Sequence, residues 1–274
     1  MWMRHWNLAR DPFSGRDAPY VPTPAHAEAE ARLVHAIEVA EPTSTLLAAP
    51  GLGKSVVLSR ALARARDPSR RIARISGPVD GAALLTGLAE GLGVRLPAGA
   101  GRALVWKRLA DAVRLGRPQG LHVVLAVDDC QHLSTPADRL DLERLAHLDP
   151  HPTARVTVVR VGRDPEPGAG PDAPAWGLAI RLRPLTRSDA ERFVTTKLAA
   201  AGRDEPAFTP RAITRLHALS AGIPRGLDRL ASLALMAGAM RRLEVIPPEV
   251  IEGVALECWG HPASPTLPTA DASG

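Results

Sequence analysis

The chain has 274 residues, enough for one large domain or two of modest size. Apolar residues make up 45% and aromatic residues only 3%, so a buried core must be built mainly from Ala, Val, Leu and Ile, while two cysteines provide neither a disulfide framework nor metal-ligand spacing. The formal charge of +5 comes almost entirely from arginine and permits contact with nucleic acid or acidic lipid without requiring it.

Residues 1–24 contain Asp11-Pro12-Phe13 and further prolines, so we expect an extended N-terminal arm. They lack the apolar stretch of a signal peptide, and no part of the chain reaches the ~18 apolar residues of a membrane span, so we expect a cytoplasmic protein without a transmembrane segment. Apolar positions at helical spacing predict a helix over residues 27–39, and Pro42 ends it before an apolar strand at 43–48.

That strand leads into Ala48-Ala49-Pro50-Gly51-Leu52-Gly53-Lys54-Ser55, which is followed by a predicted helix to about residue 66. A strand, a glycine-bearing loop and a helix in this order are typical of the phosphate-binding motif G-x-x-x-x-G-K-S/T. The glycines allow backbone N–H groups to converge on an anion, and the helix start adds its positive dipole end. Ala48 replaces the first glycine of the motif, and a strand-end alanine fits there if its φ stays negative.

This loop predicts a site for ATP and Mg²⁺. We expect Lys54 to reach the β- and γ-phosphates and the Ser55 hydroxyl to bind Mg²⁺. The nucleotide would be bound by seven consecutive residues: Pro50, Gly51, Leu52, Gly53, Lys54, Ser55 and Val56. The alternative is a chance glycine-lysine turn before an ordinary helix.

The next part of the chain alternates strands with helices, which predicts an α/β domain with a parallel sheet and helices on both faces. Further strands are expected at 71–75, 121–127, 156–161 and 178–182, and further helices at 82–92, 103–115 and 137–148. The strand at 121–127 is a continuous apolar run, as expected for a central strand covered on both faces. Residues 164–175, rich in proline and glycine, are expected to form a loop.

Two carboxylates, Asp128 and Asp129, directly follow the strand at 121–127. In a nucleoside triphosphatase, a carboxylate at the end of a strand beside the phosphate loop holds Mg²⁺. We therefore expect Asp128 to bind Mg²⁺, mostly through water, and Asp129 to orient the attacking water. The alternative is an ordinary strand that ends in a polar turn.

After Pro184 the pattern is helical only, which predicts a small all-helical domain at residues 185–258. Its helices are expected at 190–201, 209–220, 225–240 and 248–256. The first should begin at a capping box that starts with Thr186, and the second at Thr209-Pro210. Residues 259–274 are expected to form a disordered tail.

Several arginines are candidates for anion contacts. Arg225 lies in the first turn of a predicted helix, where the helix dipole does not favour a cation, so it either faces an anion such as a γ-phosphate or lies on the surface. Arg163, after the strand at 156–161, has the same two interpretations. Six further arginines cluster near Asp67 as their only counter-charge: Arg60, Arg64, Arg66, Arg70, Arg71 and Arg74. Without interleaved aromatic residues or a helix-turn-helix pattern, a solvated face is favoured over a nucleic-acid surface.

Taken in order, these segments resemble the AAA+ ATPases, in particular the ATPase region of the general secretion pathway protein A family, with transposition-helper ATPases as more distant cousins. The resemblance covers roughly residues 3 to 257, and five segments carry it: His5–Leu8 with Asp11–Phe13, Pro50–Ser55, Val127–Leu133, Arg183–Leu185 and Ser220–Arg225. It implies that Arg225 senses the γ-phosphate, and it leaves Arg181 and Arg183 as candidates for an arginine finger. The family has glutamate where this chain has Asp129, and this departure, with Ala48, predicts slow hydrolysis.

We therefore expect a P-loop NTPase domain at residues 25–184, followed by a helical lid domain. Its expected function is an ATP-binding and ATP-hydrolysing switch that binds ATP or ADP with Mg²⁺, forms a homo-oligomer on ATP binding and acts on a protein partner, for example in secretion. The alternative is a nucleotide-gated, DNA-associated adaptor in transposition or replication, with little turnover. A scaffold with a decayed site is disfavoured because Lys54, Ser55 and Asp128 all remain.

Overall fold

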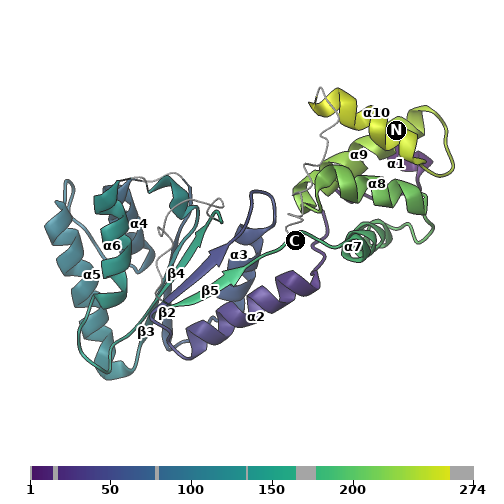
Figure 1. Ribbon diagram of the computed structural model, residues 1–274. Coiled ribbons are helices and arrows are strands. Elements are labelled where there is room, and N and C mark those ends of the chain that lie inside the picture. Colours follow the sequence, from purple (N-terminus) through teal and green to yellow (C-terminus); the bar gives the residue numbers. More distant parts are fainter. Residues whose placement is uncertain (1, 15–17, 78–79, 134, 165–176, 260–274) are drawn as a thin grey trace, which may run out of the picture. The chain divides into compact units, whose positions relative to one another are not determined.

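The computed structural model describes residues 2–14, 18–77, 80–133, 135–164 and 177–259. The chain divides into two compact units, residues 26–182 and residues 1–25 together with 183–274 (Figure 1). The loop expected at 164–175 lies outside the described residues except for residue 164. The tail expected at 259–274 lies outside them except for residue 259.

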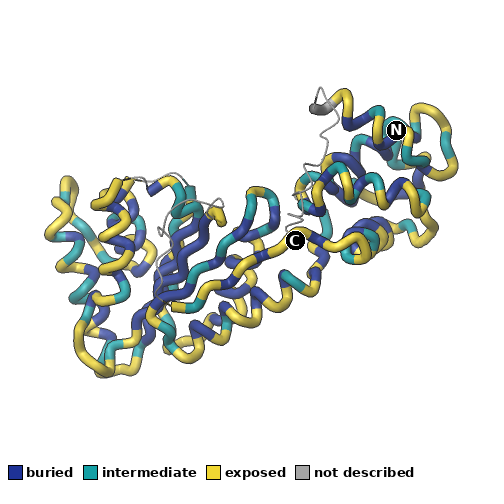
Figure 2. Tube along the Cα trace, in the orientation of Figure 1, coloured by how far each residue is buried: buried dark blue, intermediate teal, exposed yellow. Residues whose placement is uncertain are grey.

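The unit of residues 26–182 is built on a five-stranded parallel sheet in the order β2-β3-β4-β1-β5. The strands are β1 (Thr43–Leu47), β2 (Arg70–Ile75), β3 (His122–Val127), β4 (Arg155–Gly162) and β5 (Leu178–Arg181). Every residue of β3 is buried, and β3 pairs with β2 on one side and β4 on the other, so it is an interior strand as predicted. β3 and β4 are the most continuously buried strands, which Figure 2 shows as dark blue tube at the centre of this unit.

Helices cover both faces of this sheet (Figure 1). They are α2 (Pro24–Glu38), α3 (Lys54–Arg64), α4 (Gly81–Gly91), α5 (Arg102–Gly116) and α6 (Pro136–Arg144), with short 3₁₀ turns η1 (Arg117–Gln119), η2 (Cys130–His132) and η3 (Leu145–His147). Side chains of α4, α5, α6 and η3 form one apolar core with alternate residues of β3, including Val123 and Leu125. These elements confirm the predicted α/β class, although the helix expected at 137–148 changes to a 3₁₀ turn after Arg144.

The second unit is helical, as predicted for the part of the chain after residue 185. Its helices are α1 (Trp2–His5), α7 (Arg187–Ala200), α8 (Pro210–Ser220), α9 (Pro224–Met240) and α10 (Pro248–Trp259). Thr186 accepts a hydrogen bond from the Asp189 N–H at the start of α7, and Thr209 accepts one from the Ala212 N–H at the start of α8. Both predicted caps are therefore present.

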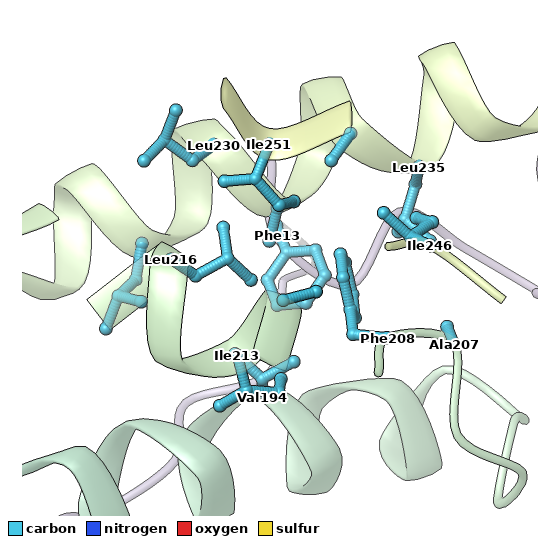
Figure 3. Packing of buried hydrophobic residues seen from close by; sticks show 14 of the residues in the cluster. Phe13, Val194, Ala207, Phe208, Ile213, Leu216, Leu230, Leu235, Ile246 and Ile251 are labelled. Atoms are coloured by element: carbon cyan, nitrogen blue, oxygen red, sulfur yellow. The ribbon is translucent and has the colours of Figure 1, made fainter. Parts of the chain in front are cut away.

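The N-terminal residues belong to the core of this helical unit. Residues 2–5 are helical, so the expectation of an extended arm over residues 1–24 is wrong for this segment. The Trp6 side chain is 1% exposed, and its indole N–H donates to the Leu235 carbonyl oxygen at 2.8 Å. Figure 3 shows Phe13 surrounded by apolar side chains of the later helices, among them Leu216 and Ile251. Burial of these two aromatic rings fixes the N-terminal segment to α7–α10.

Candidate nucleotide-binding site

The predicted loop and carboxylates all follow strands at the carboxyl edge of the sheet. β4 lies between β1 and β3, so the loop after β1 and Asp128 after β3 flank the end of the same strand. The Ala48 N–H donates to the Gly162 carbonyl oxygen of β4 at 3.3 Å. On the other side, Val127 of β3 is in register with Arg160 of β4. This edge of an open α/β sheet is where such folds bind ligands.

The loop depends on two glycines with left-handed backbone angles. Gly51 has φ 85° and Gly53 has φ 90°, values that residues with a Cβ rarely adopt. A Cβ on Gly53 would also lie only 3.0 Å from the ring of His26. Ala48 is buried at the end of β1 and is not among the residues with positive φ, so its methyl group is accommodated in place of the first glycine of the motif.

Lys54 is the first residue of α3, and its ammonium group lies against the loop. Its Nζ donates to the carbonyl oxygens of Ala48 at 2.9 Å and Ala49 at 3.2 Å, and the residue is 8% exposed. Gly53, the N-cap of α3, makes no side-chain cap, so the first-turn N–H groups have no side-chain acceptor there. A buried ammonium beside a helix start favours an anion.

The other predicted loop residues differ in exposure. Leu52 is buried, whereas Pro50, Ser55 and Val56 are exposed. Ser55, in the first turn of α3, is therefore accessible to a ligand. Leu52 anchors the loop in the core, which fixes the backbone around the two glycines.

The two carboxylates after β3 are held in different ways. Asp128 is 2% exposed; its Oδ1 accepts a hydrogen bond from the Asp129 N–H at 3.1 Å, and its Oδ2 accepts one from Arg74 at 2.9 Å. Asp129 has φ 60° and ψ 40°, a left-handed conformation that aspartate tolerates better than most residues. Its Oδ1 accepts a hydrogen bond from the Gln131 amide at 3.0 Å. Burial raises the pKa of the neighbouring Cys130 thiol to about 11, so this side chain adds no negative charge at neutral pH.

Two residues at the site were not predicted from the sequence. His26 of α2 is buried, and its Nε2 lies 2.7 Å from the Leu52 carbonyl oxygen, so a ring N–H supports the loop backbone. Arg74 of β2 makes an ion pair with Asp128. No sequence pattern around His26 indicates its contact with the loop. The expectation that β2 lies beside β3 could have indicated that Arg74 contacts Asp128.

The arginine cluster near Asp67 has more counter-charges than the sequence indicated. Arg60 and Arg64 of α3 both bind the Glu30 carboxylate of α2, at 2.8 and 3.1 Å. Arg74 binds Asp128, so Asp67 is not the only counter-charge of the cluster. The expectation of a single counter-charge is therefore wrong, because Glu30 and Asp128 come from distant parts of the sequence, whereas the three arginines remain exposed as expected of a solvated face.

Residues 40–166 match a family model described as an AAA domain. This segment is an AAA domain. It contains the phosphate-binding loop, both carboxylates and four of the five strands, and its boundaries fall within the α/β unit.

One curated protein resembles the chain beyond the AAA domain. General secretion pathway protein A from Aeromonas hydrophila is 28% identical over 251 residues, which cover 88% of this chain and 45% of that protein. The chain thus spans less than half the length of this curated relative.

Solved structures resemble the fold of the AAA domain and the helices that follow it. Cdc6p from Pyrobaculum aerophilum has a TM-score of 0.68 at 19% identity, covering 91% of this chain and 72% of that one. ORC1 from Aeropyrum pernix, in complex with DNA, has a TM-score of 0.66 at 19% identity, covering 89% and 68%. The RuvB Holliday junction branch migration motor from Thermotoga maritima has a TM-score of 0.52 at 18% identity, covering 93% and 72%. These similarities confirm the predicted AAA+ ATPase fold.

An AAA domain implies a nucleotide, and the residues present fit ATP and Mg²⁺. The glycine conformations and the buried Lys54 suit a phosphate group, while Asp128 and the Ser55 hydroxyl offer oxygen ligands. Within the described residues, no group of three or more His, Cys, Asp or Glu side chains could hold a metal ion. The helices that the structure describes include none long and apolar enough to cross a membrane.

The remaining candidate arginines are exposed. Arg163 is exposed just after β4, and Arg181 pairs with Asp164 at 3.2 Å. Arg183 and Arg225 are exposed and belong to the helical unit, where Arg225 occupies the first turn of α9 as predicted.

Proposed function

We propose that this chain is a Mg²⁺-dependent ATPase whose nucleotide state switches its interaction with a partner assembly. The observation that carries the proposal is that the Lys54 ammonium lies inside the glycine loop after β1, at the same edge of the sheet as a buried carboxylate. That carboxylate is Asp128, which follows β3, and only β4 separates β3 from β1. A cationic loop beside a buried metal-binding carboxylate is the arrangement that triphosphate chemistry requires.

Each residue of the site would have its own role in ATP binding or hydrolysis. The backbone N–H groups around Gly51 and Gly53 would bind the phosphate oxygens, and Lys54 would move from the loop carbonyls to the β- and γ-phosphates. Ser55 and Asp128 would hold Mg²⁺. The ion, when bound, neutralises the charge that develops on the phosphate oxygens. Asp129 would accept a hydrogen bond from the attacking water and orient it for in-line attack.

The conformation of Asp129 supports slow hydrolysis. Its carboxylate is one methylene shorter than glutamate, and one oxygen is engaged by Gln131. General-base catalysis depends on hydrogen-bond geometry within a few tenths of an ångström, so a short and tethered carboxylate orients water less well.

The switch would depend on Arg225 and on self-association. Arg225 is exposed in the first turn of α9, where the helix dipole disfavours a cation. A positive charge at this position is suited to bind a γ-phosphate. ATP would then favour the conformation in which Arg225 makes that contact, and a homo-oligomer would form in this state. The similarity to general secretion pathway protein A supports a secretion-related partner.

A DNA-associated adaptor is the second candidate. Arg66 and Arg71 are exposed members of the arginine cluster, and one structural neighbour was solved in complex with DNA. An adaptor would bind ATP but release little phosphate, or would release it only with DNA present.

Phosphate release with and without duplex DNA, in Mg²⁺ and in EDTA, tests the proposal. We expect slow, Mg²⁺-dependent release that Asp129→Asn stops while ATP binding remains. Asp204→Asn, an exposed aspartate of the helical unit, is the matched control and should behave like the parent. Turnover by Asp129→Asn equal to the parent rate would show that another group orients the water. A dependence of turnover on DNA would favour the adaptor.

A further inference from the structure

The buried carboxylate assigned to Mg²⁺ already has a cation beside it. Asp128 is 2% exposed, and its Oδ2 lies 2.9 Å from Nη2 of Arg74, whose side chain is 30% exposed. Arg74 is in β2, the edge strand, in register with Ala126 of β3. The end of β2 therefore delivers a guanidinium group to the metal-binding residue at the end of β3.

The same guanidinium also reaches the helix that follows the phosphate loop. Its Nη1 donates to the Ser59 hydroxyl of α3, one turn beyond Ser55, and its Nε donates to the Ser76 hydroxyl at 3.1 Å. All three nitrogens are thus engaged, and among the residues that the structure describes Asp128 is the only carboxylate that they bind. This arrangement holds Arg74 in place beside Asp128.

A buried carboxylate needs a compensating charge, and Arg74 supplies one through its ion pair with Asp128. Each carboxylate oxygen accepts one described hydrogen bond and has a second lone pair, which Mg²⁺ or its water would use. The ion then binds next to a fixed positive charge, which repels it.

The surroundings of Arg74 favour its ion pair with Asp128 over a position in the neighbouring groove. It lines an open groove of about 720 Å³ between α3 and β2, but two further arginines, Arg66 and Arg70, line the same groove. The groove contains one carboxylate, Asp67, which accepts hydrogen bonds from both the N–H and the hydroxyl of Ser69. Moving Arg74 into this groove would exchange a carboxylate partner for like charges.

We propose that Arg74 is the resident counter-cation of the metal ligand Asp128 and sets the Mg²⁺ concentration at which the nucleotide site fills. This inference rests on the proposed function, since it concerns the same Mg²⁺–ATP site. Arg74 acts through Asp128 and is a positioning residue. Its charge allows the protein to fold without metal and raises the Mg²⁺ concentration needed for binding.

The test is the Mg²⁺ concentration that gives half-maximal stabilisation of the protein against heat at saturating ATP, together with half-maximal binding of a fluorescent ATP analogue. We expect Arg74→Gln to lower both by about tenfold, because one fixed positive charge beside the ion is removed. In EDTA the same variant should unfold at a lower denaturant concentration than the parent, because Asp128 loses its partner. Arg74→Lys retains the charge and should stay within about twofold of the parent.

Two further variants complete the test. Arg71→Gln removes the same charge from an exposed position of β2 three residues before Arg74 and should leave the Mg²⁺ requirement unchanged. Ser59→Ala alters an exposed residue and removes the bond that ties Arg74 to α3, so it should lower the requirement by about twofold even if Arg74→Gln does not fold.

The inference is overturned if the Mg²⁺ requirement of Arg74→Gln is unchanged or raised. If Arg74→Gln does not fold, an unchanged Mg²⁺ requirement in Ser59→Ala overturns it. Either result would leave Arg74 with a structural role only. A parent protein that binds no ATP at any Mg²⁺ concentration would instead refute the proposed function.

Discussion

Acid should weaken this protein through one buried histidine, His122, at the start of β3. The residue is 1% exposed, and its Nε2 lies 2.9 Å from the Thr157 hydroxyl of β4. Burial, reinforced by the nearby charges of Arg155 and Arg70, lowers the pKa of His122 from 6.5 to about 4. The folded protein therefore binds fewer protons than the unfolded chain between these two pH values.

The size of the effect follows from the two pKa values. They differ by about 2.5, which corresponds to a total loss of about 3 kcal/mol of unfolding free energy once the pH lies below both values. This stability is complete above the unfolded pKa and is lost as the pH falls from 6.5 towards 4. Between pH 7 and pH 5 the loss should be about 2 kcal/mol.

Urea unfolding at pH 7 and pH 5 measures this loss. His122→Gln removes the titration but keeps an amide donor for Thr157, so its stability should change between the two pH values by about 2 kcal/mol less than that of the parent. His35→Gln, at an exposed position of α2, is the control and should follow the parent. If His122→Gln loses as much stability as the parent, burial of His122 does not control the acid response.

Three substitutions at the site have specific expected effects. Arg225→Ala should keep its ADP affinity but lose about tenfold or more in ATP affinity, since only the triphosphate supplies the γ-phosphate contact; equal losses for both nucleotides, measured side by side, would mean a structural role. His26→Ala should weaken ATP binding about fivefold, because the Leu52 carbonyl loses its donor, and an unchanged calorimetric affinity would rule out this support. Asp129→Glu should raise phosphate release or leave it intact, and a large fall would show that the site is built for the shorter carboxylate.

Much of the fold can be predicted from local sequence patterns, without knowledge of the tertiary structure. The apolar run of β3, the glycine-lysine loop before α3, and the threonine caps of α7 and α8 are each encoded within a few consecutive residues. Strand order then places the loop and Asp128 at one edge of the sheet, because parallel strands end together. The similarity of the chain to AAA+ structures agrees with this reasoning.

The features that could not be predicted depend on partners far apart in the sequence. His26 meets the Leu52 carbonyl across 26 positions, and Arg74 meets Asp128 across 54. A four-residue helix at the N-terminus is too short for periodicity to reveal it, and it persists because Trp6 is buried beside α9. Such pairs depend on which elements become neighbours in space, and residue spacing alone does not contain that information.

The central claim is that the loop around Lys54 binds the phosphates of ATP. Titration calorimetry of Mg²⁺–ATP with the parent and with Lys54→Ala tests it most directly. We expect the parent to bind and the variant to lose all measurable affinity, because a charge-assisted contact to phosphate is worth about 1.5–3 kcal/mol and Lys54 would make more than one. Lys107→Ala removes a lysine that pairs with Asp111 at 3.1 Å on α5 and should bind like the parent. Equal affinities of the parent and Lys54→Ala would contradict the assignment of this loop.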